Sequence, residues 1–176
     1  MAALASLGIP RQMESELERL AMTSGGSAHL GVLDGTDVII MARSVASAEH
    51  RRFVTMQIYV GSRLPAFCTG LGRILLANAP DAAKEAVKPA NLVKLTPRTE
   101  TNPARIMKIL QQAERDGYAT TEEELGLGYS AIAIMLGTYD KVAYAIGMSL
   151  PSAQFDRKKM IADILPLLRD IKKSPD

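Results

Sequence analysis

The segment Thr69-Gly70-Leu71-Gly72-Arg73 places a hydroxyl and two glycines at the start of an apolar run. A helix that begins here has free backbone N–H groups, and its dipole makes that end favourable for an anion. Gly70 has no Cβ, which lets a ligand carboxylate approach the main chain closely. The spacing fits neither a P-loop nor the three-glycine dinucleotide pattern. These residues suit either an anion-binding turn or a capped, tightly packed buried helix.

Cys68 precedes this turn and is the one cysteine of the chain. A thiol can act as a nucleophile, but no histidine or carboxylate lies nearby in sequence to activate it, and His29 and His50 are isolated. A small buried residue lining a pocket is the other interpretation. One cysteine excludes an internal disulfide, and two histidines argue against a Cys/His zinc site. We therefore expect no metal and no cofactor.

Three consecutive acids, Glu122, Glu123 and Glu124, are followed by Gly126 and Gly128. Such a run can supply a general acid or metal ligands, but without histidine partners a solvated loop is the ordinary explanation. The two glycines indicate a loop with a defined shape.

The elements that would position these residues alternate irregularly between helix and strand signals. An Asp34-Gly35 turn between apolar runs predicts a hairpin, and Asn102-Pro103 is a typical helix start. The patterns predict helices over 11–22, 69–77, 81–87, 103–116 and 156–172, the last interrupted at Pro166, and strands over 28–33, 38–43, 53–60, 118–120, 129–136 and 142–150. Hairpins mixed with helices favour an antiparallel α+β domain.

Composition narrows the function classes. The 176 residues suit one domain, and 47% hydrophobic with 23% charged residues is ordinary globular usage. A net charge of +2 is too small to indicate a nucleic-acid surface. No apolar run approaches the ~18 residues that span a bilayer, and the first residues lack the basic start of a signal peptide. We expect a cytoplasmic protein that does not bind membranes.

Residues 61–77, which read Gly-Ser-Arg-Leu-Pro-Ala-Phe-Cys-Thr-Gly-Leu-Gly-Arg-Ile-Leu-Leu-Ala, closely resemble the C-terminal effector-binding domain of IclR-type transcriptional regulators. Residues 32–35, 117–119 with Glu123-Glu124, and 142–151 follow in the family's order. The resemblance thus runs from about Leu4 to the last helix. The sequence of residues 62–68 is most similar to the corresponding segment of the regulators of protocatechuate and 4-hydroxybenzoate catabolism.

The resemblance implies a GAF-like fold, a curved antiparallel sheet flanked by helices, with residues 1–176 forming a single effector-binding domain. It also implies a small organic-acid effector, a homodimer or homotetramer, and an N-terminal winged helix-turn-helix that binds DNA. No DNA-reading helix precedes Met1, so we expect the DNA-binding domain to be absent from this chain and DNA to be bound only through it.

Effector-binding positions of the family fall on several residues of this chain. Its backbone donors correspond to Gly70 and Leu71, next to Thr69 and Cys68. Its acidic position falls on Thr121, which leaves Glu122 or Glu123 as substitutes, and an arginine frequent in the family is Ser130 here. The remaining pocket positions fall on Tyr129, Ala131, Gly147 and Ser149.

The resulting hypothesis is a ligand-sensing regulatory domain, not an enzyme, that binds a small organic carboxylate to control DNA binding by an appended domain. We expect this carboxylate to be aromatic. Two alternatives remain open at this point. One is a small hydrolase or transferase that uses Cys68, and the other is a dimerisation module without a ligand.

Overall fold

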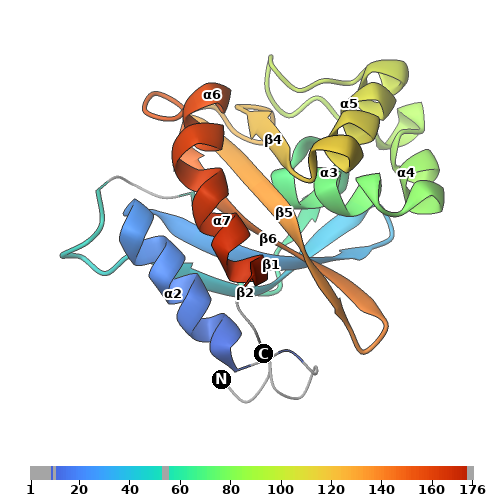
Figure 1. The fold of residues 1–176 in the computed structure, drawn as a ribbon. Helices are drawn as coiled ribbons and strands as arrows, with labels where there is room; N and C mark the ends of the chain where they lie inside the picture. Colours follow the sequence, from blue (N-terminus) through green and yellow to red (C-terminus); the bar gives the residue numbers. More distant parts are fainter. Residues whose placement is uncertain (1–8, 10, 53–55, 174–176) are drawn as a thin grey trace.

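A six-stranded antiparallel sheet organises the computed structural model, which describes residues 9, 11–52 and 56–173 (Figure 1). The strands are β1 (Ser27–Asp34), β2 (Asp37–Val45), β3 (Arg63–Pro65), β4 (Ala119–Glu122), β5 (Tyr129–Tyr139) and β6 (Val142–Pro151). Their order across the sheet is β3-β2-β1-β6-β5-β4, so β1 and β6, distant in sequence, are central neighbours.

Two tight hairpins build most of this sheet. The predicted β1–β2 hairpin is confirmed: Asp34 pairs with Asp37, and Gly35 adopts a φ of +62° in the turn between them. The β5–β6 hairpin turns at Asp140 and Lys141, which have φ values of +51° and +67°. Its strands are longer than predicted, because Gly137 lies at an irregularity within β5 and not in the turn.

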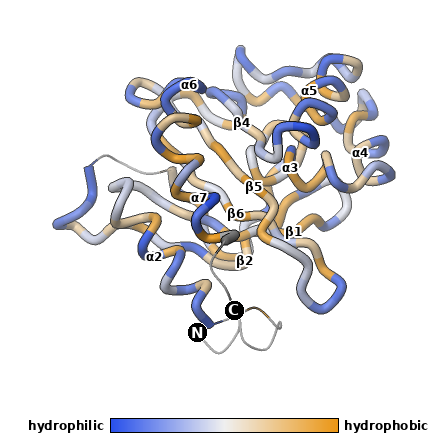
Figure 2. The backbone as a smooth tube through the Cα atoms, viewed as in Figure 1, coloured by the Kyte–Doolittle hydropathy of each residue, from blue (hydrophilic) through white to orange (hydrophobic). Residues whose placement is uncertain are grey.

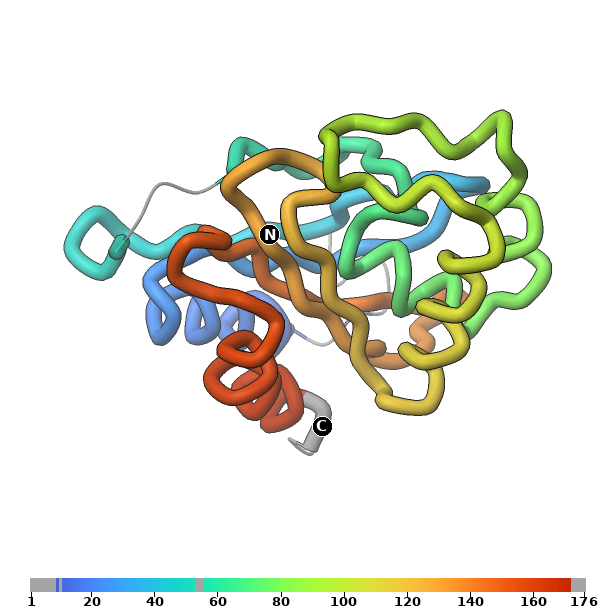
Figure 3. The backbone as a smooth tube through the Cα atoms, turned by 90° about the horizontal axis from the view of Figure 1, so that it is seen from above, coloured from blue at the N-terminus to red at the C-terminus, as the bar shows by residue number. Residues whose placement is uncertain are grey.

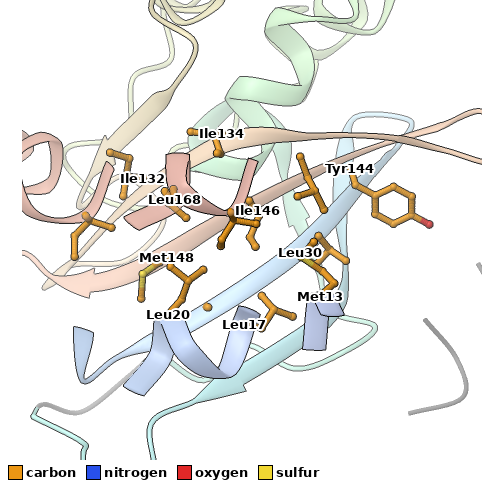
Figure 4. Close-up of a cluster of buried hydrophobic side chains, with 14 of the residues drawn as sticks. Met13, Leu17, Leu20, Leu30, Ile132, Ile134, Tyr144, Ile146, Met148 and Leu168 are labelled. Carbon is orange, nitrogen blue, oxygen red and sulfur yellow. The ribbon is translucent and has the colours of Figure 1, made fainter. Parts of the chain in front are cut away.

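One face of the sheet is covered by the first and last helices. These are α2 (Gln12–Ser24) and the C-terminal run of α6 (Arg157–Lys159), a π-helical segment (Met160–Ile164) and α7 (Leu165–Lys173). Leu17 and Leu20 of α2 pack with Leu30 of β1 and Ile146 of β6, and Leu168 of α7 joins the same cluster (Figure 4). This apolar layer is the larger part of the hydrophobic core.

The opposite face is covered by α3 (Gly70–Ala77), with α4 (Pro80–Ala86) and α5 (Pro103–Asp116) beyond it (Figure 3). Short 3-10 turns, Ala66–Cys68 and Pro89–Asn91, precede α3 and follow α4. Hydrophobic residues concentrate along α3 and the strands beneath it, whereas the tip of the β5–β6 hairpin is hydrophilic (Figure 2). No helix in the described part of the chain is both long and apolar enough to cross a membrane.

The predicted strand over 53–60 is wrong for residues 56–60, and residues 53–55 lie outside the described part. The Ser62 N–H donates to the Tyr59 carbonyl at 2.9 Å, which turns the chain before the short edge strand β3. Met56 and Ile58 are instead buried or half-buried against the α3 side of the core. Their alternation therefore reflects packing over the sheet and not pairing within it.

The C-terminal helix is interrupted, as its sequence predicts, but the irregularity precedes the proline. Pro166 has no N–H, and its ring would clash with the carbonyl of Ala162 in a regular helix. The π-helical segment Met160–Ile164 lies at this place and accommodates that constraint.

Candidate functional site

A small cavity lies between the start of α3 and the sheet. Its volume is about 50 Å³. Hydrophobic side chains dominate its wall, and no carboxylate, lysine or arginine side chain of the described residues lines it. The lining residues are His29, Ile40, Met56, Ile58, Leu64, Thr69, Gly70, Leu71, Thr121, Leu125, Tyr129, Ser130, Ala131, Ile132, Gly147, Met148 and Ser149.

Strand register brings the sheet residues of this wall together. Thr121 of β4 pairs with Ala131 of β5, which pairs with Ser149 of β6. Because paired residues of neighbouring strands point to the same face, these three form one row under α3. Gly147 of β6 and His29 of β1 belong to the next row.

The beginning of α3 forms the opposite wall. The Thr69 hydroxyl donates to the Pro65 carbonyl at 3.0 Å and accepts the Gly72 N–H at 3.2 Å, so Thr69 is the N-cap. The Gly70 and Leu71 N–H groups, which belong to the first turn, have no hydrogen-bond partner among the described residues. Two main-chain donors thus remain free at the positive end of a helix that borders the cavity.

Gly70 and Gly72 have different roles in this turn. A Cβ on Gly72 would lie 2.2 Å from the Ala66 carbonyl oxygen, so only glycine lets the preceding 3-10 turn pack on α3. A Cβ on Gly70 would lie 3.4 Å from the Cβ of Ala131, an ordinary contact. The packed-helix interpretation therefore describes Gly72, whereas Gly70 carries one of the free donors.

Arg73 and Glu124 form a buried ion pair beside the cavity that the sequence interpretation missed. The Nη1 and Nη2 atoms of Arg73 donate to the two carboxylate oxygens of Glu124 at 2.6 and 2.7 Å. The Arg73 Nε also donates to the Phe67 carbonyl at 2.8 Å, and the Glu100 N–H donates to Glu124 at 2.9 Å. This network ties α3 to the loop that carries Leu125.

Glu122 and Glu123 are not brought to the cavity. Glu122 lines a separate outer groove between α5 and β4. Glu123 accepts hydrogen bonds from the Gly128 N–H, the Ser152 hydroxyl and Arg98, and these donors hold the pKa of its carboxyl below the usual value. Glu122 is therefore part of the outer surface, and Glu123 stabilises the loop that follows β4.

Cys68 does not line the cavity and is buried in a cluster that includes Phe67, Leu76 and Leu110. Burial raises the pKa of its thiol to about 12, so the group is protonated at neutral pH. A protonated, buried thiol is a poor nucleophile. The structure thus separates Cys68 from the eight predicted site residues that do line the cavity, which are Thr69, Gly70, Leu71, Thr121, Tyr129, Ala131, Gly147 and Ser149.

His29, treated as an isolated residue in the sequence, is part of the cavity wall. It is 3% exposed, and its Nε2 has no hydrogen-bond partner among the described residues. Burial first, and the nearby charge of Arg43 second, lower the pKa of His29 to about 3. The imidazole is therefore uncharged, and only the pairing of β1 with β6 could have placed it here.

Comparison with known proteins identifies the family. The family model described as "Bacterial transcriptional regulator IclR C-terminal" matches residues 1–176. This chain belongs to that family. The IclR-type chain is 31% identical over 171 residues to the Pca regulon regulatory protein of Pseudomonas putida, covering 95% of this chain and 57% of that protein. It is 28% identical over 170 residues to the p-hydroxybenzoate hydroxylase transcriptional activator of Acinetobacter baylyi, covering 95% and 63%.

A solved structure shares the fold. It is a double mutant of the inducer-binding domain of the transcription factor PobR from Acinetobacter, in complex with 3-hydroxybenzoic acid. It superimposes with a TM-score of 0.80 at 26% identity, covering 93% of this chain and 95% of that one. The predicted family and the predicted curved antiparallel sheet with flanking helices are both confirmed. The two sequence relatives are named as regulators, and this IclR-type chain spans somewhat more than half their length.

Proposed function

We propose that the cavity under α3 binds a small aromatic carboxylate and that this chain senses that effector for a transcriptional regulator. The observation that carries the proposal is the pair of free N–H groups at Gly70 and Leu71, two residues that line a cavity with no acidic side chain among the described residues. Anions bind at such helix starts because unpaired N–H groups and the helix dipole act together. The carboxylate therefore needs no arginine or lysine in the wall.

An aromatic ring suits the rest of the wall, which is mostly hydrophobic and includes Tyr129. The PobR inducer-binding domain, which shares this fold, holds a hydroxybenzoic acid. The free cavity of about 50 Å³ is smaller than the ~150 Å³ that holds benzene elsewhere. Ring binding thus requires the flexible Met56 and the neighbouring Leu125 to move outward.

Movement of this kind connects the cavity to the rest of the molecule. Leu125 follows Glu124, which is tied to Arg73 of α3, so an acid that contacts both walls favours one arrangement of α3 and the 123–128 loop. We propose that this shift changes the packing of a homodimer or homotetramer and hence the spacing of DNA-binding domains outside this chain. A cytoplasmic location belongs to the same proposal. So does the lack of catalysis, since the thiol of Cys68 is protonated and does not line the cavity.

The test removes one main-chain donor. Gly70 is the first residue of α3, where proline is tolerated, and Thr69 has the extended conformation, φ −121° and ψ 150°, that precedes proline readily. Gly70→Pro deletes the N–H, whereas Gly70→Ala adds a Cβ and keeps it. Titration calorimetry with benzoate should show about tenfold or greater weakening for Gly70→Pro relative to Gly70→Ala, the loss of one charge-assisted hydrogen bond.

Benzamide provides the matched ligand, because it keeps the ring and lacks the charge. It should bind far more weakly than benzoate to the unaltered chain. Equal binding of benzoate by both Gly70 variants, or of acid and amide by the unaltered chain, would place the anion site elsewhere. Binding of no acid at all would favour a dimerisation module.

A further inference from the structure

His29 is a polar residue in the mostly hydrophobic wall of the cavity. The residue is 3% exposed, and its Nε2 is buried without a hydrogen-bond partner among the described residues. An unpaired buried polar atom lowers stability, and such atoms in native proteins call for an explanation. A ligand group that completes this hydrogen bond supplies one.

His29 lines the cavity together with its partner on β6. That partner is Gly147, which is packed closely against Ala133 of β5. The partner of His29 on β2 is Arg43, whose guanidinium lies over the Tyr59 ring, 5.5 Å from the centroid, and does not line the cavity. Among the described residues that line the cavity, His29 and Ser130 each have a buried side-chain polar atom without a partner, and His29 is the one on β1.

We propose that Nε2 of His29 hydrogen-bonds a hydroxyl on the effector ring, at the end opposite the carboxylate, so that the site selects hydroxylated aromatic acids. This inference rests on the proposed function above. Gly70 lies over β5 and His29 is on β1, two strands away in the order β1-β6-β5, which is about 10 Å. A ring that carries polar groups at its two ends spans such a gap, with a hydrogen bond at each.

A hydroxyl suits this nitrogen better than a second carboxylate does. A ring nitrogen of neutral imidazole is either a donor or an acceptor, and a hydroxyl can pair with both forms. A second carboxylate would be buried beside an uncharged imidazole with no cation lining the cavity, and burial of an unpaired charge is costly.

The experiment compares benzoate, 3-hydroxybenzoate, 4-hydroxybenzoate and salicylate by calorimetry on the full chain and on His29→Leu. In the unaltered chain, one of the 3- and 4-hydroxy acids should bind about tenfold more tightly than benzoate. His29→Leu should abolish that preference, so that the hydroxy acid and benzoate bind this variant with similar affinity. Salicylate, whose hydroxyl adjoins its carboxylate, should respond to the variant as benzoate does.

Ser27→Ala is the control, because Ser27 is a buried β1 residue whose hydroxyl also has no partner among the described residues, yet it does not line the cavity. It should keep the preference for the hydroxy acid. His29→Leu should fold normally, since it replaces an unpaired polar group with an apolar one, and a thermal melt checks this. A preference that survives in His29→Leu, the absence of any preference in the unaltered chain, or tighter binding of benzene dicarboxylates overturns the inference. Failure of benzoate itself to bind overturns the proposed function, and the inference falls with it.

Discussion

Arg73 of α3 and Glu124 of the loop after β4 meet in the interior as a bidentate ion pair, with N–O distances of 2.6 and 2.7 Å. The side chain of Arg73 is 2% exposed and that of Glu124 is 11% exposed. Removal of one partner from such a pair leaves a buried charge without compensation, which is more costly than the pair itself is stabilising. This contact therefore fixes α3 against the loop that closes the cavity.

Glu124→Gln should lower the free energy of unfolding by about 3–5 kcal/mol, because it leaves the Arg73 charge unpaired. Urea denaturation measures the loss. Arg73→Met/Glu124→Gln should be less destabilised than Glu124→Gln alone, since the double change removes the stranded charge. Glu16→Gln, which breaks an exposed pair with Arg19, should change stability by less than about 1 kcal/mol. A Glu124→Gln effect as small as that control would contradict the prediction.

Gly72→Ala should destabilise the fold by about 1–3 kcal/mol or more, because the new Cβ would lie 2.2 Å from the Ala66 carbonyl oxygen and backbone must shift. Gly70→Ala, two residues earlier, meets only ordinary contacts and should change stability far less. The urea midpoints of the two variants provide the comparison. Equal midpoints would show that the 3-10 turn packs on α3 with enough room for a Cβ at Gly72.

Stability should fall as the solution is acidified, and His29 should account for part of the fall. The folded pKa of His29 is about 3, below the ordinary value of 6.5, so the unfolded chain binds the proton more readily. The contribution of this group is present above pH 6.5 and is lost progressively toward pH 3. Between about pH 7 and about pH 5 the loss is about 2 kcal/mol.

His29→Gln should remove that part of the pH dependence in urea titrations at the two pH values. His50→Gln, at an exposed histidine, is the control and should retain it. A slope in His29→Gln as steep as in the unaltered chain would show that His29 is protonated or exposed in the folded state.

Cys68 should react very slowly with a thiol reagent such as a disulfide dye while the chain is folded. Its thiol is fully buried, and burial raises its pKa to about 12. In urea the same reagent should react with one thiol per chain, because Cys68 is the one cysteine of the sequence. Rapid, complete reaction of the folded chain would contradict this prediction and support a nucleophilic role for Cys68.

Met56→Ala should enlarge the cavity and favour bulkier acids. A Cβ built on Gly126 would lie only 2.9 Å from the methyl carbon of Met56. The Met56 side chain therefore fills the space next to the 123–128 loop. We expect 2-naphthoate to bind Met56→Ala more tightly than the unaltered chain. Met22→Ala, at a methionine that is 44% exposed, should leave naphthoate affinity unchanged. Equal affinity in all three proteins would mean that Met56 does not limit the cavity.

Three neighbouring acids show where local sequence stops being informative. Glu122 lines an outer groove, Glu123 accepts hydrogen bonds within the loop, and Glu124 is buried against Arg73. Glu123 has a φ of +56°, which directs successive side chains into different surroundings. A run of identical residues does not indicate this change of backbone direction. The sequence therefore favoured Glu122 and Glu123 as effector-binding substitutes and did not predict the ion pair of Glu124.

The sequence alone determined the features that depend on neighbouring residues. The β1–β2 turn at Gly35, the end of α5 at Gly117 and the start of α3 at Thr69 follow from backbone preferences and capping side chains, and the IclR resemblance rests on the same short segments. Tertiary structure alone decided what depends on strand order and register. It placed His29 beside Gly147, joined Arg73 to Glu124 across 51 residues, and turned Cys68 away from the cavity. These contacts are long-range, and the free energy that selects them comes from burying whole faces of the sheet, which no local pattern encodes.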